Sequence, residues 1–344
     1  MKLPKPQCIT DQHLITQPKF PVVDIHTHLG KLVIGEDYKD QYNMEDYIKE
    51  LKTYGVVHTV NLDGVWGNDL DQMLDKVHPY EDFVTTFCWI DVTRIDDENF
   101  EEWIVEHLHS AYEKGCRGIK MWKVISLNQK DKAGNYIRTD DDRLQIVYQT
   151  AAKLNMPVLI HIADPTAFFE EVNEENERYD ELCENPDWQF GKPGQMKFEE
   201  LMQMQDNMIE KNPQTTFIVA HVGSYAENLK HVAERLDRYP NMYVDIAARI
   251  AELGRVPYSA RKFFIDYQDR ILFGTDETPL DFAQYPICYR FLETYDEYFP
   301  YWEEGSFPGQ GSWYIYGIGL PDEVLEKVYN KNAIKLLMLE LKKI

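Results

Sequence analysis

The 344-residue sequence contains no apolar run long enough to cross a membrane. Its first twenty residues lack the apolar core of a secretory signal, and no later stretch reaches about 18 consecutive apolar residues. Its five cysteines are odd in number and form no C-x-x-C pair, which is typical of a reducing compartment rather than of a disulfide framework. We therefore expect a cytoplasmic protein that has no membrane partner.

Basic residues are also scarce. The chain has 36 Lys and Arg against 59 Asp and Glu, which gives a formal net charge of −23. Binding to nucleic acid depends on Lys and Arg that neutralise phosphates, so this charge argues against a nucleic-acid partner. It does not exclude a small anionic substrate, because a bound metal ion reverses the field around it. With 44% hydrophobic and 28% charged residues, the chain has the composition of a globular protein.

Eight short β-rich runs alternate with longer stretches of helical periodicity. The runs cover residues 22–28, 58–63, 83–91, 118–123, 157–162, 216–222, 242–247 and 271–275. This alternation predicts a parallel sheet with right-handed crossovers, and eight such units can close into a (β/α)8 TIM barrel. The rival is an open doubly wound sheet, which usually carries a Gly-rich loop after its first strand. The sequence His26-Thr27-His28-Leu29-Gly30 is unlike such a loop.

We expect a single domain over residues 21–344, preceded by an N-terminal extension of residues 1–20. Two long connections, 164–195 and 278–320, follow the fifth and eighth strands. In a barrel both would lie over the C-terminal mouth, where active sites lie. The first connection holds ten acidic and two basic side chains, and the second is rich in aromatic residues and is a candidate homodimer interface. A final helix is expected over residues 321–342.

Strand alternation directs polar side chains from several strands into this mouth. In the first strand Asp24, His26 and His28 share one face, and Val23 and Ile25 share the other, which we expect to face the helices. The same test assigns one inward polar side chain to each of strands four, five, six and eight: Lys120, His161, His221 and Asp276.

In the sixth strand, Ile218, Ala220 and Val222 are expected to face the helices. Four histidines, one aspartate and one lysine then meet at the mouth. Buried charge is costly unless it is paired or bound to metal, and one divalent cation accounts for the whole set. Imidazole with one carboxylate suits Zn²⁺, with Mn²⁺ or Fe²⁺ as alternatives.

Four segments carry a resemblance to a known family: 22–28 (Val-Val-Asp-Ile-His-Thr-His), 159–161 (Leu-Ile-His), 220–223 (Ala-His-Val-Gly) and 273–276 (Phe-Gly-Thr-Asp). They resemble the amidohydrolase superfamily of metallo-dependent hydrolase barrels, and more specifically its amidohydrolase-related branch of hydrolases and non-oxidative decarboxylases. The resemblance implies four metal ligands: His26, His28, His161 and Asp276. For His221 it implies a second-site ligand if the centre is binuclear, or a catalytic group if it holds one metal.

Lys120 and Arg249 are the candidate substrate-binding residues. In binuclear members of the family a strand-four lysine is carboxylated and bridges two metals. We favour an ammonium that binds a substrate carboxylate beside a single metal, because single-metal members are usual in the branch that this chain resembles. A structural pairing of Lys120 with Asp276 or Asp63 is the alternative. Arg249 could bind a carboxylate through its guanidinium fork, or form a surface ion pair with Glu252.

The expected function is hydrolysis of an amide, ester or lactone of a small carboxylated molecule. Asp276 would be the general base, and His221 and the metal would polarise the carbonyl. Asp164 would orient His161 or cap a helix. Non-oxidative decarboxylation on the same site is the main alternative. A metal-dependent deoxyribonuclease fits the net charge poorly, and a non-catalytic binding barrel fits the complete ligand set poorly.

Overall fold

The computed structural model describes residues 7–302 and 309–340. Within them, eight strands form one parallel sheet in which each strand pairs with the next along the chain. They are β1 Val22–Thr27, β2 Val56–Asn61, β3 Val84–Cys88, β4 Gly118–Met121, β5 Val158–Ile160, β6 Phe217–Val219, β7 Met242–Asp245 and β8 Ile271–Leu272. The last strand region meets the first, because Ile25 N donates to Phe273 O at 3.1 Å and Thr27 pairs in parallel with Glu277. The sheet therefore closes, and the predicted (β/α)8 barrel is confirmed.

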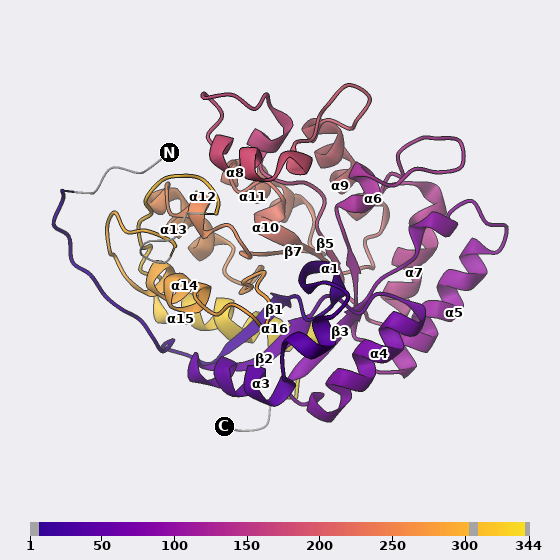
Figure 1. The fold of residues 1–344 in the computed structure, drawn as a ribbon, viewed down its shortest axis with the longest axis horizontal. Helices are drawn as coiled ribbons and strands as arrows, with labels where there is room; N and C mark the ends of the chain where they lie inside the picture. Colours follow the sequence, from indigo (N-terminus) through magenta and orange to yellow (C-terminus); the bar gives the residue numbers. More distant parts are fainter. Residues whose placement is uncertain (1–6, 303–308, 341–344) are drawn as a thin grey trace.

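Helices surround this sheet, as Figure 1 shows. The longer ones are α3 Met44–Thr53, α4 Gly67–Val77, α5 Phe100–Glu113, α7 Gln145–Lys153, α9 Phe198–Lys211, α11 Leu229–Arg238, α13 Pro257–Asp266 and α14 Gln284–Glu293. The shorter ones are α1 Lys31–Ile34, α2 Tyr38–Gln41, α6 Val124–Leu127, α8 Tyr179–Glu184, α10 Ala220–Gly223, α12 Ile250–Leu253, α15 Asp322–Glu326 and α16 Asn332–Leu337. Turns of 3-10 helix cover His78–Tyr80, Val92–Arg94, Asp142–Leu144, Thr166–Phe169 and Pro186–Trp188, and a π-helical turn covers Lys327–Lys331. Across the described residues, each helix is too short or too polar to span a membrane.

The sequence around α3 shows why such a helix forms. Asn43 precedes it, and its side chain accepts hydrogen bonds from the backbone N–H groups of Glu45 and Asp46 at 2.8 and 3.2 Å. This cap satisfies two donors that have no partner inside the helix. One turn apart on the same face, Tyr47 and Leu51 are buried against the barrel.

The C-terminal helix expected over residues 321–342 is interrupted by the π-helical turn between α15 and α16. It ends before Met338, which has a left-handed backbone with φ 51°. Ala333 and Leu337 of α16 pack into the interior of the barrel with side chains from the strands. This helix therefore closes one end of the barrel. Residues 341 and 342 of the expected helix lie outside the described residues.

The barrel interior holds a small apolar cluster of its own. It consists of Val23, Ile25, Val60, Leu62, Phe87, Leu159, Ile218, Ala220, Leu272, Ala333 and Leu337. Neighbouring residues along the strands, such as Val22 and Val219, pack with the helices in a second, larger cluster. The prediction that Val23, Ile25, Ile218 and Ala220 face the helices is therefore wrong. The inner face of a strand is apolar in its lower layers and polar only at the mouth, so one polarity cannot be assigned to a whole face.

A bulge in β1 explains how His26 still points into the barrel. The register of β1 against β2 shifts between Asp24 and Thr27, so that two residues of β1, Ile25 and His26, oppose one residue of β2. Both turn inward, Ile25 into the apolar layer and His26 into the mouth. Asp24 faces outward, where its carboxylate accepts a hydrogen bond from the hydroxyl of Tyr285 in α14 at 2.8 Å. The expected position of Asp24 on the inner face is therefore wrong.

The two long connections and the N-terminal extension lie outside the barrel. Residues 164–195 contain α8, and residues 278–320 contain α14, although 303–308 are outside the described part. Residues 7–20 follow an extended path along the side of the molecule that carries α14 and α15 (Figure 1). His13 N donates to Asp296 at 2.7 Å and so holds this segment to the second connection. The single-domain boundary at residue 21 stays a prediction.

Candidate active site

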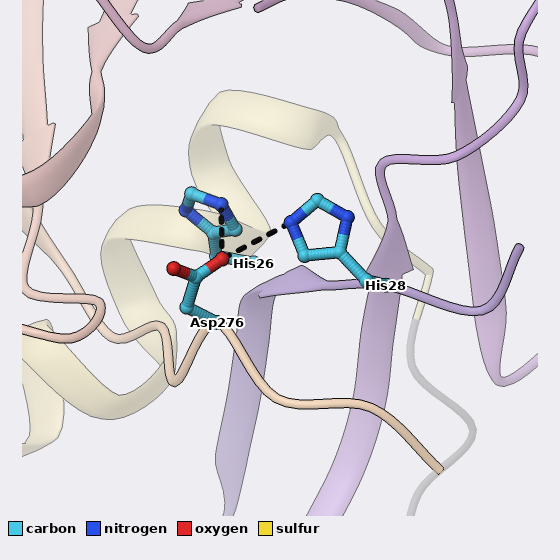
Figure 2. Close-up of side chains that lie close together, drawn as sticks. All are labelled: His26, His28 and Asp276. Atoms are coloured by element: carbon cyan, nitrogen blue, oxygen red, sulfur yellow. Dashed lines mark hydrogen bonds and ion pairs between the residues drawn. The ribbon is translucent and has the colours of Figure 1, made fainter. Parts of the chain in front are cut away.

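Three of the predicted metal ligands converge at the mouth of the barrel. The Nε2 atoms of His26 and His28 lie 3.1 and 3.0 Å from the same oxygen, Oδ1, of Asp276, as Figure 2 shows. The ligand atoms of these three residues all lie within 4.8 Å of one another. Burial of Asp276 would raise its pKa, but the two histidines outweigh this effect and hold the pKa well below its usual range. Asp276 is therefore ionised.

In each of the two histidines, the second ring nitrogen, Nδ1, donates a hydrogen bond to a buried carboxylate. His26 Nδ1 donates to Asp245 and His28 Nδ1 donates to Asp63, both at 2.8 Å. A carboxylate on Nδ1 fixes the tautomer and turns Nε2 toward a metal. Burial would lower the pKa of His28, but the carboxylates of Asp63 and Asp276 outweigh it and raise that pKa to about 9. The position between the Nε2 atoms therefore favours positive charge, and the donor set fits a divalent transition metal.

His161 and His221 form a second pair beside this trio. His221 Nε2 lies 3.2 Å from His161 Nδ1, and His161 Nε2 lies 3.2 Å from Asp164 Oδ1. Asp164 therefore contacts His161 as expected, and it also binds Lys123 at 2.6 Å. Burial lowers the pKa of His161 to about 4 and holds that of His221 well below its usual range, so both imidazoles are neutral. The role of His161 as a fourth ligand stays a prediction.

His221 reaches the mouth through an irregular backbone. It follows β6 in a left-handed conformation with φ 59°, so alternation along the strand does not set its direction. Its backbone N–H donates to Asp245 Oδ1 at 2.7 Å, and its Nδ1 donates to Ala247 O at 2.9 Å. The Nε2 atom of His221 is therefore the nitrogen without a proton. It can accept a proton from a neighbouring group.

Lys120 is buried in the same mouth. Its Nζ lies 3.3 Å from His26 Nε2, and among the described residues no carboxylate lies within 4.0 Å of it. Burial lowers the pKa of Lys120 to about 8, against the attraction of Asp276 and Asp245. The alternative in which Lys120 forms a close ion pair with Asp276 or Asp63 is not what the structure shows. In the part of the chain that the structure describes, the amine therefore has no close carboxylate partner.

Arg249 is also buried, with 7% of its surface exposed. It precedes α12, and its Nη1 donates to the carbonyl of Ala248 at 2.6 Å. Burial and the charge of Arg178 lower its pKa, whereas Asp164 and Asp276 act in the opposite direction. The surface ion pair between Arg249 and Glu252 is absent from the described part of the chain, because Glu252 is buried and binds Arg178.

Aromatic rings and a pocket border the site. The ring of Trp122, just past β4, lies 5.4 Å from that of His28 and 5.1 Å from that of Trp89. On another side of Asp276, a cavity of about 280 Å³ is lined by Asp276 itself, Glu277 and side chains of the 278–320 connection. The site therefore has a flat apolar wall on the side of β3 and β4, and open space beside its carboxylate.

Asp245 is the site residue that the sequence analysis missed. It lies at the end of β7 and is fully buried, and it contacts His26 and the backbone of His221. The alternation test applied to the other strands would have found it. Met242 and Val244 pack with the helices, so Asp245 belongs to the inward set.

Comparison with known proteins supports these observations. A sequence model of the amidohydrolase family matches residues 23–339. A comparison with curated protein sequences finds no match.

Solved structures share the fold at low sequence identity. A 2,6-dihydroxybenzoate decarboxylase from Rhizobium is 14% identical, with a TM-score of 0.58 over 93% of this chain and 99% of the other. A dihydroxybenzoic acid decarboxylase from a Polaromonas species, with bound manganese and the inhibitor 2-nitroresorcinol, is 12% identical, with a TM-score of 0.57 over 93% and 97%. An amidohydrolase from Burkholderia multivorans with bound zinc is 11% identical, with a TM-score of 0.52 over 93% and 100%. At these identities the likeness concerns the fold.

Proposed function

The chain belongs to the amidohydrolase family, and we propose that it is a metal-dependent hydrolase of an amide, ester or lactone of a small carboxylated molecule. The observation that carries the proposal is the convergence of His26 and His28 on Asp276, with a buried carboxylate behind each imidazole. This is the arrangement of a metal centre. A non-catalytic barrel would have no need of an ionised carboxylate beside two oriented imidazoles.

We assign the metal to His26, His28, His161 and Asp276, as one divalent ion, with Zn²⁺ preferred and Mn²⁺ or Fe²⁺ as alternatives. Such an ion supplies Lewis-acid chemistry, because it lowers the pKa of water and withdraws electron density from a carbonyl. Lys120 remains an unmodified ammonium in this proposal. Its closeness to His26, at 3.3 Å, places a positive charge beside the ligands. A second, lysine-bridged metal is therefore not part of the assignment.

We assign the proton transfers and the binding of the substrate carboxylate to residues of the chain. Asp276 is ionised and takes the proton of the attacking water as general base. His221 is neutral, and its unprotonated Nε2 accepts this proton from Asp276 and delivers it to the leaving group, which restores the Asp276 carboxylate. Lys120 and Arg249 hold the substrate carboxylate by charge-assisted hydrogen bonds. These two cations also offset the repulsion that a chain of net charge −23 exerts on an anionic substrate.

Decarboxylation of an aromatic acid is the second candidate. It is favoured by the ring of Trp122 beside His28, which offers a flat surface to a planar substrate. The dihydroxybenzoate decarboxylases among the similar structures also favour it. In that reaction Nε2 of His221 would first take up a proton from solvent and then transfer it to the ring carbon that loses CO₂.

One screen separates the two candidates. The metal-loaded protein is assayed with lactones, N-acyl amino acids and aromatic or unsaturated carboxylic acids, while proton release and CO₂ release are both recorded. For esters and lactones, proton release without CO₂ supports hydrolysis. For N-acyl amino acids, whose products are a carboxylate and an ammonium with no net proton released, free amine without CO₂ supports it. CO₂ release supports decarboxylation. Binding of carboxylates without turnover of any substrate would contradict both and favour a binding barrel.

A further inference from the structure

A buried charge cluster lies next to Arg249. Arg178, just before α8 in the 164–195 connection, is only 1% exposed. Its Nη1 donates to Glu181 Oε2 at 2.8 Å, and its Nη2 donates to Glu252 Oε1 in α12. Burying a guanidinium is costly, and two carboxylate partners of this kind offset that cost. One arginine therefore binds two buried glutamates that come from different connections.

The cluster also contacts the second long connection, residues 278–320. The guanidinium of Arg178 lies 5.2 Å from the ring centre of Trp313, in the 278–320 connection. The indole N–H of Trp313 donates to the carbonyl of Ala251, in α12, at 3.0 Å. Arg178 thus lies where the connections after β5, β7 and β8 meet. It is rigidly placed by contacts with all three.

Arg249 directly precedes α12 and lies three residues before Glu252 in the chain. Burial raises the pKa of Glu181, and the charges of Arg178 and Arg249 act against this effect, so Arg249 lies within electrostatic range of Glu181. Yet among the described residues no carboxylate lies within 4.0 Å of the Arg249 guanidinium. The second oxygen of Glu252, Oε2, is buried without a hydrogen-bond donor. Glu252 could therefore accept a second guanidinium, and Arg178 is the group that holds it in place.

We propose that Arg178 is a positioning residue: by binding Glu181 and Glu252 it leaves the Arg249 guanidinium free for the carboxylate of the substrate. The inference rests on the proposed function for the existence of a carboxylated substrate. Without Arg178, two buried carboxylates would remain unpaired. Of the two other arginines close by, Arg255 is already paired with Glu177, whereas Arg249 has no carboxylate within 4.0 Å among the described residues and would be drawn to them. Arg249 would then be neutralised inside the protein, and the anion site would be lost.

The test compares Arg178→Met with a triple variant, Arg178→Met/Glu181→Gln/Glu252→Gln, in metal-loaded protein. The probes are benzoate and its uncharged analogue benzamide, and binding is measured by calorimetry. In Arg178→Met the dissociation constant for benzoate should rise at least about 10-fold, with little change for benzamide. In the triple variant no carboxylate remains to bind Arg249, so benzoate affinity should return to within about threefold of the wild-type value.

A rescue of this kind separates positioning from mere structural support. If Arg178 only stabilised the fold, the triple variant would bind benzoate as weakly as the single variant or more weakly, and this result would overturn the proposal. So would unchanged benzoate binding in folded Arg178→Met. If Arg178→Met fails to fold, Glu181→Gln/Glu252→Gln in the presence of Arg178 serves instead. That variant should keep benzoate affinity, and a loss of 10-fold or more would contradict the inference.

Failure of the proposed function would look different. In that case Arg249→Met and wild-type protein would bind benzoate equally, whatever residue occupies position 178. If Arg249→Met weakens benzoate binding but Arg178→Met does not, the anion site is correct and only the positioning role is wrong.

Discussion

Replacement of Asp245 by asparagine tests how the metal centre is oriented. Asp245 Oδ1 accepts two backbone N–H groups, those of His221 at 2.7 Å and Ala247 at 3.2 Å, and Oδ2 accepts His26 Nδ1 at 2.8 Å. In Asp245→Asn the amide oxygen must stay with the two backbone donors, because an amide nitrogen cannot accept from them. The new NH₂ group then faces His26 Nδ1 and requires it to be an acceptor.

The tautomer of His26 is reversed by this change. The proton moves to Nε2, which is the nitrogen that faces Asp276 and that a metal would need unprotonated. Loss of such a supporting group typically weakens metal binding by about 10- to 100-fold. This corresponds to about 1.4–2.8 kcal/mol, at 1.4 kcal/mol for each factor of ten. The metal-free fold should lose less, about 1 kcal/mol, because the two backbone hydrogen bonds are kept and the one to His26 is replaced by one of reversed direction.

The measurement is a titration of metal-free protein with Zn²⁺ against a competing chelator, together with thermal unfolding of the metal-free form. Asp206→Asn is the matched control. Asp206 is a buried carboxylate in α9 that binds Arg235 at 2.9 Å and belongs to neither histidine pair. We expect it to lower stability without changing metal affinity. If Asp245→Asn binds Zn²⁺ as tightly as wild-type protein, then Asp245 does not set the tautomer of His26, and the reasoning is refuted.

Three further outcomes follow from the site. Purified wild-type protein should hold about one equivalent of divalent metal, and His26→Ala/His161→Ala should lose it; equal metal content in both proteins would contradict the ligand assignment. Asp276→Asn keeps the shape but removes the base, so turnover of any substrate found should fall at least ~10²-fold, and retained turnover would show that another group is the base. Lys120→Met should raise KM for a carboxylic acid far more than for its methyl ester, and equal effects on both would assign Lys120 a structural role.

The fold could be predicted from the sequence because its signals are local and repeated. Eight β-rich runs separated by helical stretches leave few topologies, and all eight strands lie within one or two residues of an expected start. The structure of the C-terminal end was harder to predict from the sequence. The π-helical turn of Lys327–Lys331 and the left-handed Met338 depend on how α16 meets the bottom of the barrel, which no local pattern records.

For the site, alternation worked where the backbone is regular. Lys120 in β4 and His161 after β5 are inward, and their neighbours Ile119 and Ile160 pack with the helices. The test also selected His26 in β1, but for an incorrect reason. It placed Val23 and Ile25 on the face toward the helices, whereas both lie in the barrel interior. The partners of Arg249 could not be predicted from the sequence for a different reason. Glu252 could pair either with the nearby Arg249 or with an arginine far away in the sequence, and only tertiary contacts decide between them.

The irregular positions are themselves part of how the centre is built. His26 lies in a bulge, and His221 and Asp276 have left-handed backbones with φ 59° and 72°, a conformation that costs on the order of 1 kcal/mol or more for residues other than glycine. Each of the two left-handed residues is held by a hydrogen bond from the neighbouring strand. Asp276 N donates to His26 O at 2.8 Å, and His221 N donates to Asp245 Oδ1 at 2.7 Å.

These bonds link the proposed metal site to His221, the proposed proton-transfer residue. Asp245 orients the imidazole of His26 with one oxygen and secures the backbone of His221 with the other. The same carboxylate therefore sets both the ligand direction of one histidine and the position of another. A regular strand would have presented only alternate residues to the mouth. The departures from regularity bring Asp276 and the two histidines into one small volume, and buried carboxylates between the strands stabilise those departures.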